Sequence, residues 1–147
     1  MTGEWVYKNI KPKIICEKLL DENITDYKFY CFNGEPKVLL VCKDRIVEVK
    51  MNYYDMNLNL LPFTQKAKNS LEKIDISESI EILKDLSKKL SAKFPHVRVD
   101  FFIVKNKIYF SELTFFDSNG FEAFKPVEWD YILGSYLVLP TENYQSR

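Results

Sequence analysis

The chain has 147 residues, of which 46% are hydrophobic, 15% aromatic and 29% charged, so it is too apolar for an intrinsically disordered protein. Its 21 basic and 21 acidic residues cancel, so no overall field attracts nucleic acid or anionic lipid, and an anion has to be bound by a local site. We expect a single domain over residues 1–147, with no nucleic-acid partner.

Cysteine usage indicates a reducing compartment. Cys16, Cys31 and Cys42 are odd in number and lie in apolar runs, so we expect buried free thiols. The absence of a CxxC spacing and the single histidine argue against a zinc site. The N-terminus has no apolar signal core, and no stretch reaches the ~18 apolar residues of a membrane-spanning helix. We therefore expect a cytoplasmic protein that does not insert into membranes.

The first third of the chain predicts strands. Ile14–Leu20 is a short apolar run and is expected to form a buried strand. Residues 27–32 and 37–42 flank Asn33-Gly34, the dipeptide most typical of a tight β-hairpin.

The middle of the chain predicts one more strand, a loop and a helix. Residues 45–53 alternate apolar with charged side chains, which is typical of a strand, and residues 57–73 predict a loop. Asp75 and Glu78 have the spacing of a capping box, so we expect a helix to begin there and to end before Pro95. Its apolar face repeats every three or four residues, at Ile76, Ile80, Leu83, Leu86 or Ser87, and Leu90.

The last third predicts a second hairpin and a second helix. Residues 97–104 and 108–115 are β-rich and are joined by a turn at 105–107, and a helix is expected from Pro126 until shortly before Pro140. Hairpins instead of crossovers predict an antiparallel β-sheet with helices packed on one side, which is an α+β fold.

The second hairpin carries the candidate chemistry. A three-residue turn places Asp100 opposite Glu112 and Arg98 opposite Thr114, all on one face of the sheet. Two carboxylates among apolar neighbours need a cation in order to stay ionised. Two carboxylates combined with water and phosphate oxygens are the usual ligands of Mg²⁺, so the pattern indicates a metal site.

Two alternatives to this metal site remain open. In the first, Asp100 or Glu112 pairs with Arg98 and nothing else binds. A two-residue turn would shift the register by one, so that Asp100 and Glu112 would point to opposite faces of the sheet.

These residues resemble a known family. The stretches Arg98-Val-Asp100-Phe and Ile108-Tyr-Phe-Ser-Glu112-Leu-Thr114-Phe resemble the carboxy-terminal metal hairpin of the ATP-grasp enzymes. Further stretches resemble the TupA-like branch, which is associated with bacterial teichuronopeptide and cell-surface polysaccharide synthesis. They include Asp26-Tyr-Lys-Phe-x-Cys-Phe-Asn-Gly-Glu-Pro36, Glu112-Leu-Thr-Phe-Phe116 and Trp129-Asp-Tyr-x-Leu-Gly134.

The resemblance implies a site for ATP and Mg²⁺. It makes Asp100 and Glu112 the acidic ligands of ATP-bound Mg²⁺. Thr114 stands where many relatives have an asparagine ligand. Arg98 is implied to face the phosphates at the reacting end, and Lys28 to reach phosphate or substrate, with a solvent-facing lysine as the alternative.

The resemblance also implies a place for the nucleoside. Glu17 and Leu20 match the hinge that reads adenine mainly through backbone groups, and Asp26 matches the acid that holds the ribose hydroxyls. The alternatives without a ligand are that Glu17 lies at the solvated end of a strand and that Asp26 caps a turn. The loop Ser118-Asn119-Gly120 is either a contact to acceptor or phosphate, or a surface turn.

The chemistry implied by the resemblance is the joining of a carboxylate to an amine through an acyl phosphate, with a small carboxylate or a sugar-linked acceptor as substrate. No Gly-rich loop with a phosphate-binding lysine is found, so we expect the carboxy-terminal half of such an enzyme, which binds ATP weakly and turns over little. A missing N-terminal half or a homodimer partner would complete it. The alternative is a non-catalytic interaction module that keeps the fold.

Overall fold

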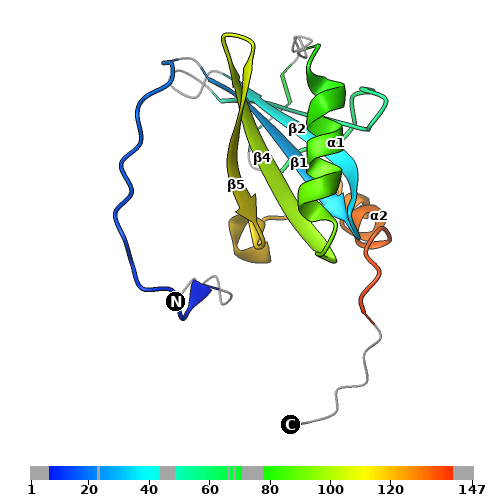
Figure 1. Ribbon diagram of the computed structural model, residues 1–147. Coiled ribbons are helices and arrows are strands. Elements are labelled where there is room, and N and C mark those ends of the chain that lie inside the picture. Colours follow the sequence, from blue (N-terminus) through cyan, green and yellow to red (C-terminus); the bar gives the residue numbers. More distant parts are fainter. Residues whose placement is uncertain are drawn as a thin grey trace.

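The computed structural model describes residues 7–22, 24–43, 49–65, 67, 69–70 and 78–140. Within these residues five strands, two α-helices and a short 3₁₀ helix follow one another along the chain (Figure 1). They are β1 (Thr25–Phe32), β2 (Glu35–Lys43), β3 (Lys50–Tyr54), α1 (Ile80–Ser91), β4 (His96–Val104), β5 (Lys107–Thr114), η2 (Asp117–Gly120) and α2 (Glu128–Gly134).

The strands form one antiparallel sheet in the order β3-β2-β1-β4-β5. The α+β class is confirmed. The hairpin of β1 and β2 is also confirmed, and it turns through Asn33 at φ 50° and Gly34 at φ 81°. Both residues are left-handed, as a two-residue turn between twisted strands requires.

The hairpin of β4 and β5 differs from the prediction near its turn. Only Lys105 and Asn106 form the turn, both with positive φ, so the predicted three-residue turn is wrong. Phe102 accordingly lies opposite Tyr109 and not opposite Phe110. A β-bulge then inserts one extra residue, Ser111, into β5.

This bulge compensates for the shorter turn. Beyond it, Asp100 lies opposite Glu112 and Arg98 opposite Thr114, which confirms the predicted register at the residues of interest. The alternative in which the two acids point to opposite faces is thereby excluded.

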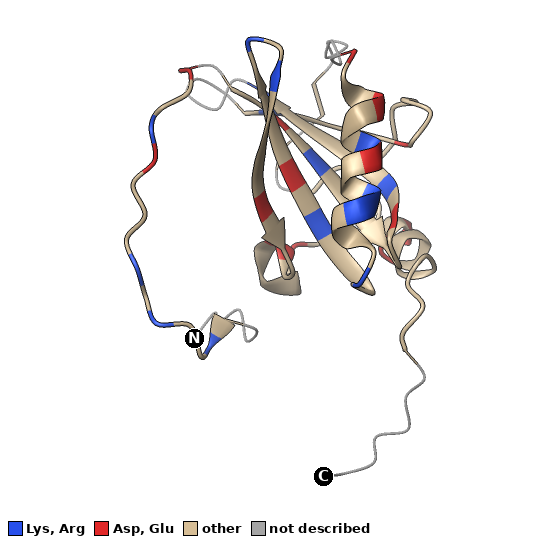
Figure 2. Cartoon of the chain, in the orientation of Figure 1, with Lys and Arg blue, Asp and Glu red and all other residues tan. Residues whose placement is uncertain are grey.

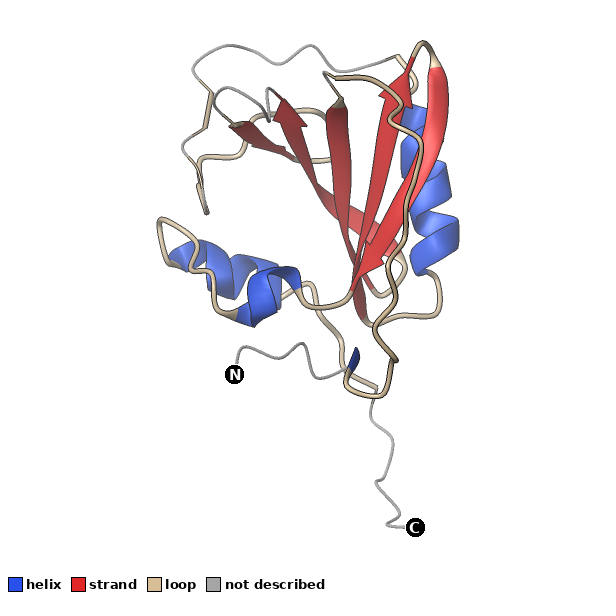
Figure 3. Cartoon of the chain, turned by 90° about the vertical axis from the view of Figure 1, so that its left-hand side faces the viewer, coloured by secondary structure: helices blue, strands red, loops and turns tan. Residues whose placement is uncertain are grey.

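Each face of the sheet buries its own apolar cluster. Leu83 of α1 packs with Phe29 and Val99 on one face, and Leu133 of α2 packs with Leu40 and Tyr53 on the other. Helices therefore flank the sheet on both sides (Figure 3). Both helices were expected on one side of the sheet, but α2 covers the face opposite α1. Strands β1 and β2 are therefore buried on both faces.

Several predicted boundaries shift. Helix α1 begins at Ile80, whereas Asp75 and Ile76 lie outside the described residues. Helix α2 begins at Glu128, two residues after Pro126, and ends at Gly134. The predicted strand at 45–53 is observed as β3, and residues 44–48 lie outside the described part of the chain.

The predicted buried strand at Ile14–Leu20 is wrong. Residues 11–20 have no regular structure, and Ile14 is 94% exposed. Cys16 is exposed as well, which corrects the expectation that all three thiols are buried, whereas Cys31 and Cys42 are buried. Figure 1 shows this segment running away from the sheet.

None of the helices in the described ranges combines the length and the apolar character needed to cross a membrane.

Candidate active site

The candidate site lies on the sheet face that α1 leaves uncovered. In β1, Lys28 lies opposite Asp100 of β4, and Tyr30 lies opposite Arg98. Since Glu112 and Thr114 of β5 lie opposite Asp100 and Arg98, the three neighbouring strands β1, β4 and β5 bring acids and bases together. Figure 2 shows these acidic and basic positions side by side on the strands.

Asp100 is the buried centre of this cluster. Its side chain is fully buried and accepts hydrogen bonds from two cationic side chains. Arg98 donates from Nε to Oδ1 and from Nη2 to Oδ2, each at 2.8 Å, and Lys28 Nζ donates to Oδ2 at 2.6 Å. A buried carboxylate is stable in this form because its charge is paired and its oxygens are hydrogen-bonded.

Arg98 connects Asp100 with the rest of the site. Its Nη2 also donates to Thr114 Oγ1 at 3.0 Å and to Glu112 Oε1 at 3.3 Å, and its Nη1 lies 2.6 Å from Asp117 Oδ1. Burial opposes the charge of Arg98, but the hydrogen bonds and charge of Asp100, together with Asp117, outweigh it and raise the pKa above its ordinary value. The guanidinium is therefore a fixed positive charge.

Asp117 was missed by the sequence prediction. It begins η2, in which Ser118 and Asn119 have left-handed backbones with φ of 52° and 59°. Tyr30 donates from its hydroxyl to Asp117 Oδ2 at 2.7 Å, while Oδ1 pairs with Arg98. Burial, followed by the charge of Asp117, raises the pKa of Tyr30 well above its ordinary value, so its hydroxyl stays a donor. The available signal was an acid three residues beyond Thr114 in a loop that follows the hairpin.

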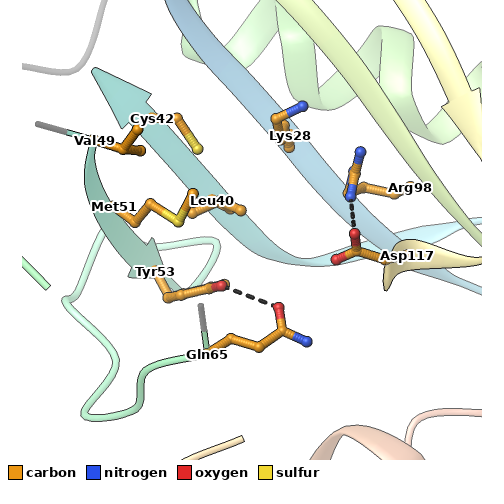
Figure 4. A pocket seen from close by; sticks show the side chains of 9 residues that line it. All are labelled: Lys28, Leu40, Cys42, Val49, Met51, Tyr53, Gln65, Arg98 and Asp117. Carbon is orange, nitrogen blue, oxygen red and sulfur yellow. Dashed lines mark hydrogen bonds and ion pairs between the residues drawn. The ribbon is translucent and has the colours of Figure 1, made fainter. Parts of the chain in front are cut away.

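A cavity of about 220 Å³ lies beside this cluster; its described lining includes Lys28, Arg98 and Asp117 but not Asp100, Glu112 or Thr114. Figure 4 shows Lys28 and Arg98 on one side of it and the apolar side chains of β2 and β3 on the other. Asp117, which is paired with Arg98, also lines it, as does Gln65, whose Oε1 accepts a hydrogen bond from Tyr53 at 3.3 Å. The cavity thus offers a fixed guanidinium and an ammonium to a bound anion.

Asp26 belongs to the same face. It lies within β1, opposite Cys42 and Phe102, so the alternative of a turn cap does not describe it. Its carboxylate is almost fully buried, and Oδ1 lies 3.7 Å from Lys28 Nζ. Lys28 therefore stands between two buried acids.

The two predicted hinge residues are not brought to this cluster. Glu17 is exposed in the segment without regular structure. Leu20 lines a separate cavity of about 310 Å³ at the β4–β5 turn, beside Val104 and Tyr109. The described lining of that cavity includes neither Arg98 nor Asp100.

The oxygen donors of the site fit a hard cation. Asp100 and Glu112 are directly opposed carboxylates, and Thr114 Oγ1 donates to Glu112 Oε1 at 2.7 Å. Within the described ranges no three histidine, cysteine or acidic side chains form a group that would hold a metal by themselves. Two carboxylates with substrate phosphates are a usual set for Mg²⁺, so the donor set suits a metal that arrives with a nucleotide. The ion pair with Arg98 that was left open above is formed, and it involves both Asp100 and Glu112.

Comparison with known families decides the assignment. The family model described as TupA-like ATPgrasp matches residues 2–138. The chain belongs to this family. No curated protein matches the chain, and no solved structure does. The hairpin that pairs Asp100 with Glu112 thus occurs in a TupA-like ATP-grasp chain.

Proposed function

We propose that this TupA-like ATP-grasp chain is the Mg²⁺-ATP-binding part of a carboxylate–amine ligase, acting in the synthesis of bacterial cell-surface polysaccharide or teichuronopeptide. The observation that carries the proposal is the register of β4 and β5, which sets Asp100 against Glu112 beside two cations. A small carboxylate and an amine on a sugar-linked or amino-acid acceptor are the proposed substrates. A second copy or a separate lobe is the proposed partner that closes over the nucleotide.

In this proposal each side chain has a defined role. Asp100 and Glu112 would hold Mg²⁺, with Thr114 beside them, and the metal supplies charge that offsets the phosphates of ATP. Arg98 and Lys28 would face those phosphates and stabilise charge that develops during phosphoryl transfer. Asp117 and Tyr30 keep the guanidinium in place, since Asp117 contacts it from the side opposite Asp100.

Glu112→Gln is the sharpest test because Glu112 is half exposed, at 57% of its side chain, and its loss leaves the buried pairs intact. At a Kd of about 1 mM, roughly 5 mM Mg²⁺-ATP adds about 1 kcal/mol to the stability. That raises the melting temperature by about 3 °C in a domain of this size. We expect this shift for the wild type, and expect it to disappear in Glu112→Gln and when EDTA removes the metal.

Glu35→Gln is the matched control. Glu35 is also half exposed, at 49%, and pairs with Lys88 at 2.6 Å, but it lies outside the site. It is expected to keep the full shift. A wild-type chain that shows no shift with Mg²⁺-ATP would contradict the proposal.

The second candidate is a non-catalytic interaction module. Its support is that Lys28 and Arg98 already neutralise Asp100, so the fold is satisfied without metal. The absence of a shift with Mg²⁺-ATP would favour it.

A further inference from the structure

A second cavity adjoins the one beside the charged cluster. Its volume is about 440 Å³, within the ~300–1,000 Å³ usual for ligand pockets. Both cavities are lined by Gln65 and Asp117, so they meet at these two residues. Gln65 is fixed there, because its Nε2 donates to the backbone oxygen of Glu122 at 3.1 Å and its Oε1 accepts from Tyr53.

The walls of this second cavity are mostly aromatic. Rings from β1, from the start of β4 and from the segment around η2 contribute to it, including Tyr30, Phe32, His96, Phe116 and Phe124. The rings of Phe32 and His96 lie 4.5 Å apart, and burial lowers the pKa of His96, which makes this ring neutral. Flat, uncharged aromatic faces bind the apolar faces of other rings and also attract cations.

The charged groups that line this cavity are acidic. They are Asp117, Glu122 and Asp130, and no lysine or arginine joins them in its described lining. Asp117 is already paired with Arg98, so Glu122 and Asp130, both exposed, set the charge at the opening. The first cavity differs in that its lining contains two cations, Lys28 and Arg98, beside Asp117.

We propose that the second cavity binds the acceptor, and that this acceptor is an amino sugar of about one hexose in size, bound through its ammonium group. The assignment rests on the proposed function, which requires an amine beside the bound donor. The sugar ring stacks on the aromatic wall, and the ammonium group lies near Glu122 and Asp130, one of which would take its proton so that the neutral amine becomes the nucleophile. The phosphates of the donor would lie beside Lys28 and Arg98 in the first cavity, and the amino group of the acceptor beside Glu122 and Asp130 in the second.

Three hexoses that differ mainly in charge test this assignment: glucosamine, glucose and glucuronate. Binding to the full chain is measured by heteronuclear NMR titration without ATP. We expect glucosamine to perturb residues of the second cavity and to bind at least about fivefold more tightly than glucose, because its ammonium meets carboxylates. Glucuronate is expected not to perturb this cavity. Equal binding of all three sugars, tighter binding of glucuronate or binding of none overturns the proposal.

Variants separate the contributions. Asp130→Asn and Glu122→Gln are each expected to weaken the binding of glucosamine several-fold and to leave the affinity for glucose unchanged. Phe116→Ala is expected to weaken the binding of both sugars. Asp85→Asn, on the exposed face of α1, is the control and is expected to change neither. Unchanged glucosamine affinity in both acid variants contradicts the assignment.

The proposed function and the proposed acceptor site can be contradicted independently of each other. Glu112→Gln is expected to remove the response to Mg²⁺-ATP and to leave glucosamine binding intact. Glucosamine binding without any response to Mg²⁺-ATP contradicts the proposed function alone. A response to Mg²⁺-ATP without glucosamine binding contradicts only the acceptor site.

Discussion

Asp100 has no exposed surface, and its two oxygens are held by Lys28 and Arg98. Replacing it by asparagine leaves two cations next to a neutral amide in a buried place. Breaking a buried pair in this way typically costs about 3–5 kcal/mol. We therefore expect Asp100→Asn to lower the free energy of unfolding, measured in urea, by that amount.

The matched comparison is Glu112→Gln, whose carboxylate is half exposed and lies 3.3 Å from Arg98. Exposed pairs contribute about 0–1 kcal/mol, so the loss is expected to be small. Equal losses in the two variants would mean that Asp100 is not the centre of the network. This difference is why the nucleotide test uses Glu112.

His96 makes the stability depend on pH. Burial lowers its pKa below the ordinary value of 6.5, so the folded state binds the proton less readily than the unfolded state. The stability is therefore fully present above pH 6.5 and is lost as the pH falls from there towards the folded-state pKa. The loss is expected to be at most about 1.4 kcal/mol per pH unit.

His96→Phe isolates this effect, because a phenyl ring still stacks on Phe32 but cannot titrate. It loses the contact of Nδ1 with the backbone oxygen of Cys31 at 3.0 Å, which lowers stability equally at every pH. Urea unfolding at pH 7.5 and 5.5 is expected to show a steeper fall for the wild type than for the variant. Parallel curves would refute the assignment to His96.

At the scale of elements, hairpin patterning predicted the antiparallel sheet, and it predicted the register of β4 and β5 correctly beyond the bulge but not near the turn. Alternation and Asn33-Gly34 identified β1 and β2, and the opposition of Asp100 and Glu112 was correct. The assumption of a three-residue turn, from which this pairing was predicted, was wrong, since the turn is one residue shorter and a bulge at Ser111 compensates for it. A bulge leaves no mark in an alternating pattern of five or six residues, so turn length and bulge could not be separated from the sequence.

Tertiary contacts account for the other misses. Apolar composition predicted a strand at Ile14–Leu20, but a strand forms only where a neighbour pairs with it, and none is described beside this segment. The side of the sheet taken by α2 was missed because Asp26 and Lys28 give the second face of β1 a polar character, although most of that face is buried. Asp117 reaches Arg98 through the left-handed turn of η2, which sequence spacing does not indicate.

Three glycines differ in backbone conformation and in the space around them, so their replacement by alanine is expected to change stability by different amounts. Gly34 has φ +81°, and an added Cβ would meet Ala92 Cα at 3.2 Å; Gly120 has φ +74° with open space, and Gly134 is helical with open space. Gly34→Ala and Gly120→Ala are each expected to cost about 1–2 kcal/mol of stability or more, because both glycines have a left-handed backbone. The cost is expected to be greater at Gly34, where the added Cβ also meets Ala92. Gly134→Ala is expected to be neutral or to stabilise by up to about 1 kcal/mol.

Urea unfolding of the three alanine variants measures this order directly. The difference between Gly34 and Gly120 gives the contribution of the close contact. A Gly34→Ala chain as stable as Gly134→Ala would contradict the observed packing of the β1–β2 turn on the end of α1.

At the scale of the whole molecule, a neutral chain sorts its charges locally. Lys28 and Arg98 lie in one cavity, and Glu122 and Asp130 line the next, while the totals cancel. Such an arrangement creates no long-range attraction for anions, but it provides local sites of either sign. Binding at the cationic cavity is therefore expected to depend on the bound metal and on short contacts more than on the overall field.

The exposed segment before β1 provides the last test. Residues 11–19 are exposed and have no regular structure, and they include Lys11, Lys13 and Lys18. Lys28, in contrast, is held within the sheet by Asp100. Limited trypsin digestion is thus expected to cleave after Lys13 and Lys18, but not at Lys11, which precedes Pro12, and to do so well before any site in the strands, as mass spectrometry of a time course would show.

The trimmed chain that remains is expected to melt within about 2 °C of the full chain, because residues 8–18, which are among those removed, are exposed. Its response to Mg²⁺-ATP tests the hinge prediction separately: a smaller shift would support a role for Glu17 in holding the nucleoside, and an unchanged shift would exclude one. Resistance of the segment to trypsin, or a large fall in melting temperature after trimming, would instead mean that the segment packs on the domain in solution.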